Sequence, residues 1–564
     1  MVTRPKGMAG GARVRPPSVP AIRRPQRVSS RCSRCLATAR GGEGESWEDY
    51  LTKEERPDGS KHFRFVGGLK SGRQAKSRRR VHFVGIGGSG LSNLAKLAMA
   101  RGWLVTGSDI SESDKLESLR EGGALVDVGH REDNVLEKEG ADCLPDAIVV
   151  SSAVSADNVE VRCALRYNIP LYKRGAWLGR VTSGHDLVSV AGTHGKTTTT
   201  AMVAEVLGSL CPEAEGGVTA IVGGDVASWE DGGAVVGEGQ TFVLEADEYD
   251  RTFLGLRSRH AIVTNVELDH LDVYESEEEI LQAFEEFLEN VSQSGAVVMC
   301  GDDLGCRALL ERREIGPEGG EEGAGPSVQT YGYGGGNDWR ATDVRVEGGG
   351  VTSFKVERRG EVILEQCRLP LLGRHNVLNA LGAIALAAAV GPGGRSDREC
   401  AEEAAQVLAS FRGVERRCQV LGRKGSRVVV SDYAHHPTEV QATLEAVSEH
   451  YAEADLVVVF EPHTLSRLAY FFKEFAEVLQ QCPRVFLTKV HEPVKTYISA
   501  KVKNAIAEDL EGEIGRDTAT YIPGDEDLIA EVARAAQRGG GETVVLVLGA
   551  GRSHALAHGI LEAL

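Results

Sequence analysis

The chain has 564 residues, of which 41% are hydrophobic and 26% are charged, and its formal net charge is −18. At about 150 residues per domain, this length predicts three or four domains, each large enough to bury a core. The negative net charge argues against a general binder of nucleic acid or anionic membranes. No apolar run reaches the ~18 residues that a membrane span needs. The 11 cysteines lack the spacing of a disulfide scaffold or zinc module.

The first 40 residues differ from this average, because they hold ten basic residues and no acidic one. Arginine, serine, proline and alanine prevail, and the apolar core of a secretory signal is missing. This composition is typical of an organellar transit peptide. We therefore expect residues 1–78 to be a transit peptide and linker without a fixed fold; a disordered basic tail is the alternative.

The first folded domain is expected over residues 79–184 and opens with a nucleotide-binding pattern. A short apolar strand at 81–84 leads into a GxGxxG turn, after which apolar residues recur at helical spacing. Such glycines let the backbone approach a pyrophosphate at a helix N-terminus, and polar residues at strand ends can bind the rest of a ligand. The candidate ligand-binding residues are Gly85, Gly87, Gly88, Gly90, Ser108, Asp109, His130 and Ser151.

The ligand of this domain stays open at this point. Asp109 lies where an acid can accept a hydrogen bond from a ribose hydroxyl, which fits a dinucleotide. A nucleotide sugar fits equally well, and the glycines could serve only the packing of helix against strand.

The second domain, expected over 185–411, carries a stronger signal. A buried strand at 187–191 meets GTHGKTTTT at 192–200, which then begins a helix. Backbone N–H groups in such a loop point at phosphate oxygens, Lys196 can neutralise the β- and γ-phosphates, and the Thr197 hydroxyl can reach Mg²⁺. The candidate ATP-binding residues are Gly192, Thr193, His194, Gly195, Lys196, Thr197 and Thr198.

A phosphate loop also needs acids for its metal. The next strand, 241–244, ends at Glu245, and the strand after it, 261–264, runs into a segment that contains His270. Carboxylate oxygens suit Mg²⁺, and an imidazole can join a second ion. Thr197, Glu245 and His270 are therefore the metal candidates. Their acidic neighbours have no assigned role: Asp247, Glu248 and Asp269.

The third domain, expected over 412–564, repeats the pattern of strands that end in polar or glycine-rich loops before helices. The whole chain is therefore predicted to be α/β, with Rossmann-like first and third domains around a central P-loop ATPase domain. Asp432, His435 and His436 could be taken for a metal site, but the sequence offers no evident fourth ligand.

Seven motifs carry a family resemblance: HFVGIGGSG (82–90), GTHGKTTTT (192–200), EADEYD (245–250), TNVELDHLD (264–272), GRHNVLNA (373–380), DYAHHPTEV (432–440) and EPHTLSR (461–467). In this order, over residues 80–564, the chain resembles the Mur ligase family. The histidine of GTHGKT and the DYAHHPTEV motif resemble the branch that joins L-alanine to UDP-N-acetylmuramate, rather than other branches or the folylpolyglutamate synthases.

The resemblance implies an ATP- and Mg²⁺-dependent ligase that forms an amide through an acyl phosphate. Its first domain would bind UDP-N-acetylmuramate, its second ATP and its third L-alanine. With the basic N-terminus, it also implies peptidoglycan precursor synthesis in a plastid stroma, or otherwise in the cytoplasm. A nucleic-acid partner is not expected, and a homodimer stays open.

Matched motif positions imply roles for individual residues. Lys196, Glu245 and His270 would be catalytic. The nucleotide would be contacted by His375, Asn376, Asn379 and Asp432, its phosphate by Arg416 or Arg417, and the amino-acid side by Tyr433, His435 and Arg467. Thr464 stands where many relatives carry an arginine, which leaves Arg467 to hold the alanine carboxylate alone.

Two other hypotheses compete with the ligase. A non-catalytic plastid scaffold of the same fold would not need Lys196, Thr197, Glu245 and His270. A dehydrogenase, suggested by GxGxxG alone, leaves the GKT loop unexplained.

Overall fold

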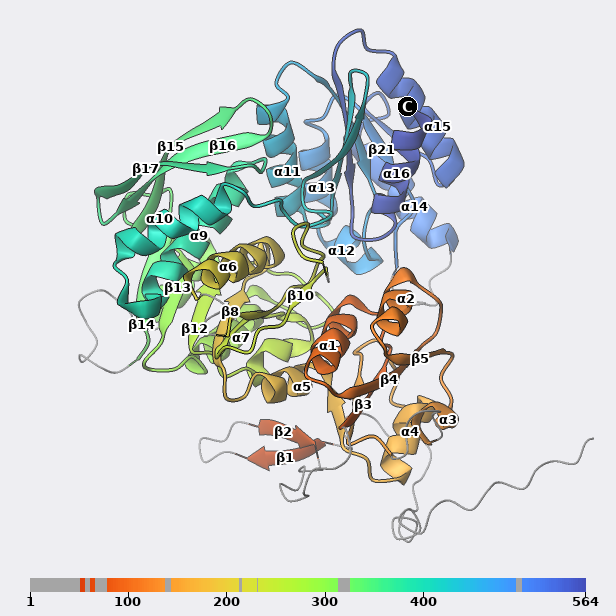
Figure 1. The fold of residues 1–564 in the computed structure, drawn as a ribbon. Coiled ribbons are helices and arrows are strands. Elements are labelled where there is room, and N and C mark those ends of the chain that lie inside the picture. Colours follow the sequence, from red (N-terminus) through yellow and green to blue (C-terminus); the bar gives the residue numbers. More distant parts are fainter. Residues whose placement is uncertain are drawn as a thin grey trace, which may run out of the picture.

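The computed structural model describes residues 51–55, 61–65, 79–136, 144–211, 216–230, 232–312, 325–492 and 500–564. Three α/β lobes follow one another along the chain, orange, yellow-green and blue in Figure 1. The predicted α/β class is thus confirmed. Before the lobes, β1 (Leu51–Glu55) and β2 (Lys61–Phe65) pair antiparallel. The other residues of the expected transit peptide and linker, 1–50, 56–60 and 66–78, lie outside the described residues.

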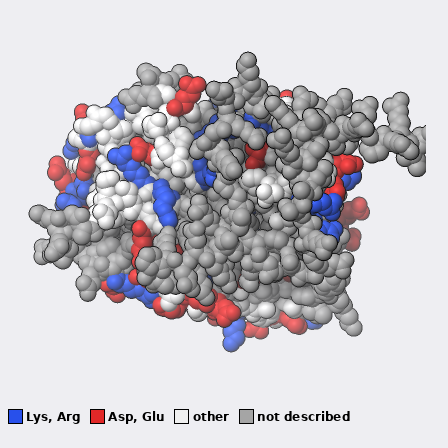
Figure 2. All heavy atoms as spheres, turned by 90° about the horizontal axis from the view of Figure 1, so that it is seen from below, with Lys and Arg blue, Asp and Glu red and all other residues white. Residues whose placement is uncertain are grey.

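The described surface is mixed in charge. In the view of Figure 2, Lys and Arg side chains lie near Asp and Glu side chains at several places on the part of this face that is described. Within the described ranges, no helix has both the length and the apolar character that a bilayer crossing requires.

The first lobe is a five-stranded parallel sheet in the order β5-β4-β3-β6-β7. Its strands are β3 (Arg80–Val84), β4 (Leu104–Asp109), β5 (Leu125–Val128), β6 (Ala147–Val150) and β7 (Leu171–Lys173). Its helices are α1 (Ser89–Ala100), α2 (Asp114–Glu121), α3 (Glu132–Leu136), α4 (Val159–Arg166) and α5 (Arg174–Val181). The strand order reverses at β3, so the carboxyl ends of β3, β4 and β6 form the crevice where open parallel sheets bind ligands.

The central lobe is built on a ten-stranded sheet in the order β10-β9-β11-β8-β12-β13-β14-β15-β16-β17. Its strands are β8 (Asp186–Ala191), β9 (Thr219–Ile221), β10 (Ala234–Val235), β11 (Thr241–Glu245), β12 (His260–Val263), β13 (Ala296–Cys300), β14 (Ser327–Gly332), β15 (Trp339–Glu347), β16 (Val351–Arg358) and β17 (Glu361–Leu369). Strands β8, β9 and β11 to β15 run parallel, whereas β10 and the β15–β17 meander are antiparallel.

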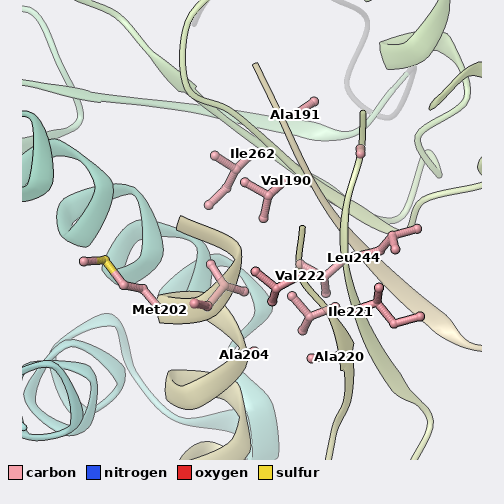
Figure 3. Packing of buried hydrophobic residues seen from close by; sticks show 14 of the residues in the cluster. Val190, Ala191, Met202, Ala204, Ala220, Ile221, Val222, Leu244 and Ile262 are labelled. Atoms are coloured by element: carbon pink, nitrogen blue, oxygen red, sulfur yellow. The ribbon is translucent and has the colours of Figure 1, made fainter. Parts of the chain in front are cut away.

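The helices of the central lobe are α6 (Lys196–Leu210), the 3₁₀ segment η3 (Tyr249–Gly255), α7 (Glu277–Glu289), α8 (Leu304–Arg312), α9 (Arg374–Val390), η4 (Pro392–Gly394) and α10 (Asp397–Leu408). Helix α6 packs on the sheet, and its Met202 belongs to the same buried apolar cluster as Val190 and Ile262 of the strands (Figure 3). Full burial of such side chains stabilises the fold by about 1.5–3 kcal/mol each. This packing fixes the N-terminus of α6 at the carboxyl end of β8.

The third lobe is a six-stranded sheet in the order β18-β19-β23-β20-β21-β22, in which only β18 is antiparallel to its neighbour. Its strands are β18 (Gln419–Lys424), β19 (Arg427–Asp432), β20 (Asp455–Phe460), β21 (Val485–Leu487), β22 (Ala519–Tyr521) and β23 (Thr543–Leu548). Its helices are α11 (Pro437–His450), α12 (Leu465–Tyr470), α13 (Phe472–Leu479), α14 (Ala500–Ile514), α15 (Asp525–Gln537) and α16 (Ser553–Ala563).

Candidate active site

The glycine-rich loop joins β8 to α6 and is tied to the loop that follows β12. Gly192 has a φ of 135°, and a Cβ there would lie 1.9 Å from Oγ1 of Thr264, so only glycine fits. The Thr193 hydroxyl donates to the carbonyl of Glu267 at 3.0 Å, and the His194 N–H donates to Asn265 Oδ1 at 2.7 Å. The loop is therefore preformed, with the first N–H groups of α6 available to an anion.

Lys196 lies at the centre of this loop, with its side chain 12% exposed. Its Nζ donates to the carbonyls of Gly192 (2.6 Å) and Thr193 (3.0 Å) and to Glu248 Oε1 (2.9 Å). Burial by itself lowers the pKa of Lys196, but the carboxylates of Glu248 and Asp247 outweigh this and raise it. The ammonium group is therefore held charged where the sequence predicts phosphates.

Thr197 and Glu245 lie together at the start of α6 and the end of β11. The Thr197 hydroxyl donates to Glu245 Oε1 at 3.0 Å, and the N–H of Gly223 donates to Glu245 Oε2 at 2.5 Å. From the third lobe, Arg417 Nη2 donates to Thr197 Oγ1 at 3.2 Å. A hydroxyl beside a carboxylate is an oxygen donor set that fits Mg²⁺.

His270 is brought to Glu248 rather than to Glu245. Its Nε2 lies 3.3 Å from Glu248 Oε1, and the donor atoms of Asp247, Glu248 and His270 all lie within 4.8 Å of one another. Burial lowers the pKa of His270, but the bond to Glu248 and the charge of Asp269 raise it overall. Glu248 is fully buried and contacts Lys196 as well, so this acid, which the sequence left without a role, is central to the site.

Helix α9 begins beside the phosphate loop. A Cβ on Gly195 would lie 2.7 Å from Asn379 Oδ1, and Asn379 Nδ2 donates to Asn376 Oδ1 at 3.0 Å. Asn376 also donates to the carbonyl of Leu372, which closes the first turn of the helix. Burial lowers the pKa of His375 to about 4, which keeps this imidazole neutral at pH 7. Capping and nucleotide contact are therefore compatible roles for the two asparagines.

Arg416 and Arg417 enclose the ring of Tyr433. Their guanidinium carbons lie 4.7 and 4.8 Å from its centroid. Arg416 donates to backbone carbonyls of the third lobe at Gly549 and Gly551, whereas Arg417 reaches the phosphate loop. Of the two arginines between which the sequence could not choose, Arg417 is the one at the nucleotide side.

Asp432 serves its own lobe in this structure. Its two oxygens accept from the N–H groups of Cys418 and Ala434, and burial raises its pKa to about 6. The sequence predicts a nucleotide contact for this residue, but the carboxylate instead shapes the loops on either side of β19.

Arg467 bridges the third and central lobes. Its Nε and Nη2 donate to Asp269 Oδ1 at 3.0 and 2.6 Å, and its Nη1 lies 3.1 Å from His463 Nδ1. Both charged side chains are about 93% buried. Although burial raises the pKa of the Asp269 carboxyl, Arg467 holds it far below its usual range. The residue expected to bind a substrate carboxylate thus already holds a carboxylate of the central lobe.

In the first lobe, two predicted ligand residues are used internally. Asp109 accepts from the N–H of Gly87 at 2.8 Å and therefore holds the glycine turn itself. Ser108 is fully buried, and its hydroxyl bonds to His130 Nδ1 (2.9 Å) and Glu160 Oε2 (2.5 Å). Gly85 and Ser151 do lie together, since a Cβ on Gly85 would lie 3.0 Å from that of Ser151. Gly88, in contrast, is exposed.

Sequence reasoning missed two residues of this lobe. Glu160 is fully buried and accepts from Ser108, Asn134 Nδ2 and the N–H of Arg131, which fixes the loop that carries His130. Arg174 at the start of α5 lies beside Gly90 and donates to Asp247 Oδ2 of the central lobe at 3.1 Å. Neither belongs to a motif, so no local pattern could have singled them out.

Comparisons with known proteins agree with this arrangement. Three family models match the chain: "Mur ligase family, catalytic domain" over residues 80–186, "Mur ligase middle domain" over 190–387 and "Mur ligase, glutamate ligase domain" over 416–551. The chain is 36% identical over 493 residues to UDP-N-acetylmuramate–L-alanine ligase of Carboxydothermus hydrogenoformans, covering 87% of this chain and 97% of that protein.

Two further relatives point the same way. The UDP-N-acetylmuramate–L-alanine ligase of Salinibacter ruber is 39% identical over 479 residues, covering 84% of this chain and 92% of that protein. The crystal structure of the Thermotoga maritima UDP-N-acetylmuramate-alanine ligase superposes with a TM-score of 0.67 at 29% identity, covering 86% of this chain and 98% of that one.

Proposed function

The chain belongs to the Mur ligase family, and from that premise we propose that it joins L-alanine to UDP-N-acetylmuramate, using ATP and releasing ADP and phosphate, in peptidoglycan precursor synthesis. The family resemblance of the motifs is thereby confirmed. The observation that carries the function is the phosphate loop itself: Lys196 bonds to the buried carboxylate of Glu248, and arginines reach this site from both neighbouring lobes, Arg174 from the first and Arg417 from the third.

The reaction explains why such a site is needed. A carboxylate is a poor electrophile, so transfer of the γ-phosphoryl group to the muramate carboxylate supplies a leaving group. The alanine nitrogen then attacks the acyl carbon, the C–N bond forms, the C–O bond to phosphate breaks, and the nitrogen loses a proton. Because the acceptor and the γ-phosphate are both anionic, the transfer requires positive charge that is already in place.

Lys196 and the N–H groups at the start of α6 would hold the phosphates. Thr197 and Glu245 would hold one Mg²⁺, and His270 beside Glu248 would serve a second ion; the donor atoms fit these roles. Bound Mg²⁺ supplies screening of the repulsion between the reacting anions. Asn376, Asn379 and His375 would line the nucleotide side at the start of α9.

The outer lobes would bring the other two substrates. We assign the glycine turn at Gly85 to Gly90, with His130 and Ser151, to the nucleotide sugar. Tyr433, His435 and Arg467 would bind L-alanine, whose carboxylate has to share Arg467 with Asp269. This assignment divides the chain into the sugar lobe 79–184, the ATP lobe 185–411 and the amino-acid lobe 412–564.

The test is a phosphate-release assay on the purified protein with ATP, Mg²⁺ and all combinations of nucleotide sugar and amino acid. The proposal expects turnover with UDP-N-acetylmuramate and L-alanine and a lower kcat/KM with glycine or serine. Tight nucleotide binding without phosphate release in any combination would instead favour the non-catalytic scaffold. Light scattering on the same sample decides between a monomer and a homodimer.

We further propose that residues 1–78 target the ligase to a plastid stroma. The support is the basic, acid-free composition of the first 40 residues, together with a reaction that belongs to a bacterial type of cell wall.

A further inference from the structure

Four titratable side chains meet where the phosphate loop faces the N-terminus of α11. His194 comes from the phosphate loop, Glu267 from the loop after β12, and His436 and Glu439 from the start of α11. The His194 ring lies 4.7 Å from that of His436 between centroids, and the hydroxyl of Thr438 donates to Glu267 at 2.7 Å. The ATP lobe and the amino-acid lobe are thus in direct contact at this point.

Glu439 makes the largest number of polar contacts in this group. Its Oε1 lies 3.2 Å from His194 Nδ1, and its Oε2 lies 3.2 Å from His435 Nδ1. Arg417 Nη1, from the same lobe, is 4.0 Å from Oε1. One carboxylate, 13% exposed, therefore contacts the phosphate loop, a residue of the proposed amino-acid pocket and the arginine that reaches Thr197.

A simpler role for Glu439 is helix capping. His436 is the N-cap of α11, and Glu439 Oε2 accepts from the N–H groups of His435 (3.0 Å) and His436 (3.3 Å), as in a capping box. Capping uses Oε2, however, whereas His194 and Arg417 lie at Oε1 and contribute nothing to the cap. Glutamine caps as well as glutamate does, so the two roles can be separated by removing the charge alone.

We propose that Glu439 is a positioning residue of the ligase, whose negative charge docks the amino-acid lobe onto the phosphate loop through His194 while it orients His435 and Arg417. This inference rests on the proposed function. Alanine then reaches the activated carboxylate in the correct geometry only when Glu439 contacts His194. A displacement of about 1 Å in such a site can reduce the rate by about 100-fold.

The experiment compares Glu439→Gln with Glu445→Gln, an exposed glutamate two turns along the same helix, in the phosphate-release assay. For Glu439→Gln we expect kcat to fall by about 100-fold, with a raised KM for L-alanine and an unchanged KM for UDP-N-acetylmuramate, which binds the other lobe. Glu445→Gln should resemble the wild type. A Glu439→Gln enzyme within about twofold of the wild type in all three parameters would overturn the proposal.

A second measurement does not depend on turnover. Hydrogen–deuterium exchange of residues 192–198 should accelerate in Glu439→Gln, although the substitution lies in a different lobe, while exchange within α11 should stay slow because the cap persists. Unchanged exchange in the phosphate loop would refute the docking role even if the wild type proved inactive. Inactive wild-type protein with accelerated exchange in the variant would refute the ligase assignment and leave the docking contact standing.

Discussion

The ammonium of Lys196 pairs with the buried carboxylate of Glu248. Two loop carbonyls and the buried Glu248 accept its three hydrogen bonds, so the ammonium is oriented before any phosphate arrives. A group held in this way costs little reorganisation when charge develops beside it.

Replacing Lys196 by alanine should therefore abolish turnover. The expected loss of kcat is about 1000-fold, the upper end of the range of about 100- to 1000-fold found when a group that stabilises transition-state charge is removed. Binding of UDP-N-acetylmuramate should persist, because its proposed site lies in another lobe; isothermal titration of the nucleotide sugar provides this control. Turnover near the wild-type level would contradict the assignment of the phosphate loop.

Arg467→Ala should raise the KM for L-alanine more than it lowers kcat. It should also destabilise the protein by about 3–5 kcal/mol, because it leaves the buried Asp269 without its partner. The double variant Arg467→Ala/Asp269→Ala separates the two effects in a steady-state assay combined with denaturant unfolding. Stability should largely return in it, while the KM should stay high; a KM that returns with the stability would remove Arg467 from the alanine pocket.

The imidazole of His194 makes the contact between lobes sensitive to pH. Burial lowers its pKa, but Glu439 and Glu267 outweigh this and raise the pKa to about 10. An unfolded histidine has a pKa of ~6.5. Because the folded value is the higher one, the stabilisation is complete below pH ~6.5 and is lost as the pH rises through about 10.

We therefore expect the difference in melting temperature between the wild type and His194→Gln to be largest near pH 6 and to shrink toward pH 10. Differential scanning fluorimetry at pH 6, 8 and 10 measures this directly. A difference that stays constant over this range, or that grows with pH, would show that His194 is not held protonated by the two glutamates.

At the scale of the element, the phosphate loop depends on one glycine. Gly192 adopts a left-handed conformation, and a methyl group there would collide with Thr264. Gly208, in the last turns of α6, has no heavy atom within 4 Å of the corresponding position. Gly192 precedes the helix and Gly208 lies within it, and they differ in what an added carbon would meet.

Gly192→Ala should consequently destabilise the central lobe and reduce ATP-dependent turnover by at least an order of magnitude, since it displaces the loop that holds Lys196. Gly208→Ala should stabilise α6 by about 0.5–1 kcal/mol and leave turnover unchanged. Thermal unfolding and the phosphate-release assay test both variants. Equal effects of the two substitutions on stability and turnover would contradict the requirement for glycine in the phosphate loop.

At the scale of the whole molecule, the site is assembled from all three lobes. Arg174 of the first lobe bonds to Asp247 of the second, and Arg417 and Arg467 of the third bond to Thr197 and Asp269 of the second. On the proposed assignment, we therefore expect turnover to require that the three lobes dock onto one another.

The targeting proposal also belongs to this scale, because it separates the catalytic lobes from the N-terminal stretch. Residues 1–78 fused to a fluorescent protein should direct it into plastids, and the ligase without residues 1–75 should keep its activity but lose import. Import of the truncated protein would refute the targeting role. Loss of activity on truncation would instead assign the segment to the catalytic body.

The sequence by itself determined the α/β class and the family, and it predicts the chemistry of the central lobe. Apolar runs that end in GxGxxG or GTHGKT specify strand, turn and helix locally, and the backbone of a phosphate loop needs these residue types whatever surrounds it. Lys196, Thr197 and Glu245 could therefore be named without coordinates.

Only the tertiary structure decided which side chains are shared between lobes and which are used internally. Ser108 and Asp109 are the last residues of a strand, where ligand residues are often found, yet Ser108 bonds to the distant Glu160 and Asp109 accepts from the glycine turn. Glu248 is one of several acids in its motif and Glu439 is a single acid near a helix start, and spacing gives neither of them a role; in the structure, Glu248 is buried against Lys196 and Glu439 faces His194. The burial and the bonding partners of a side chain depend on contacts between residues far apart in the chain, and the local spacing of residue types does not predict these contacts.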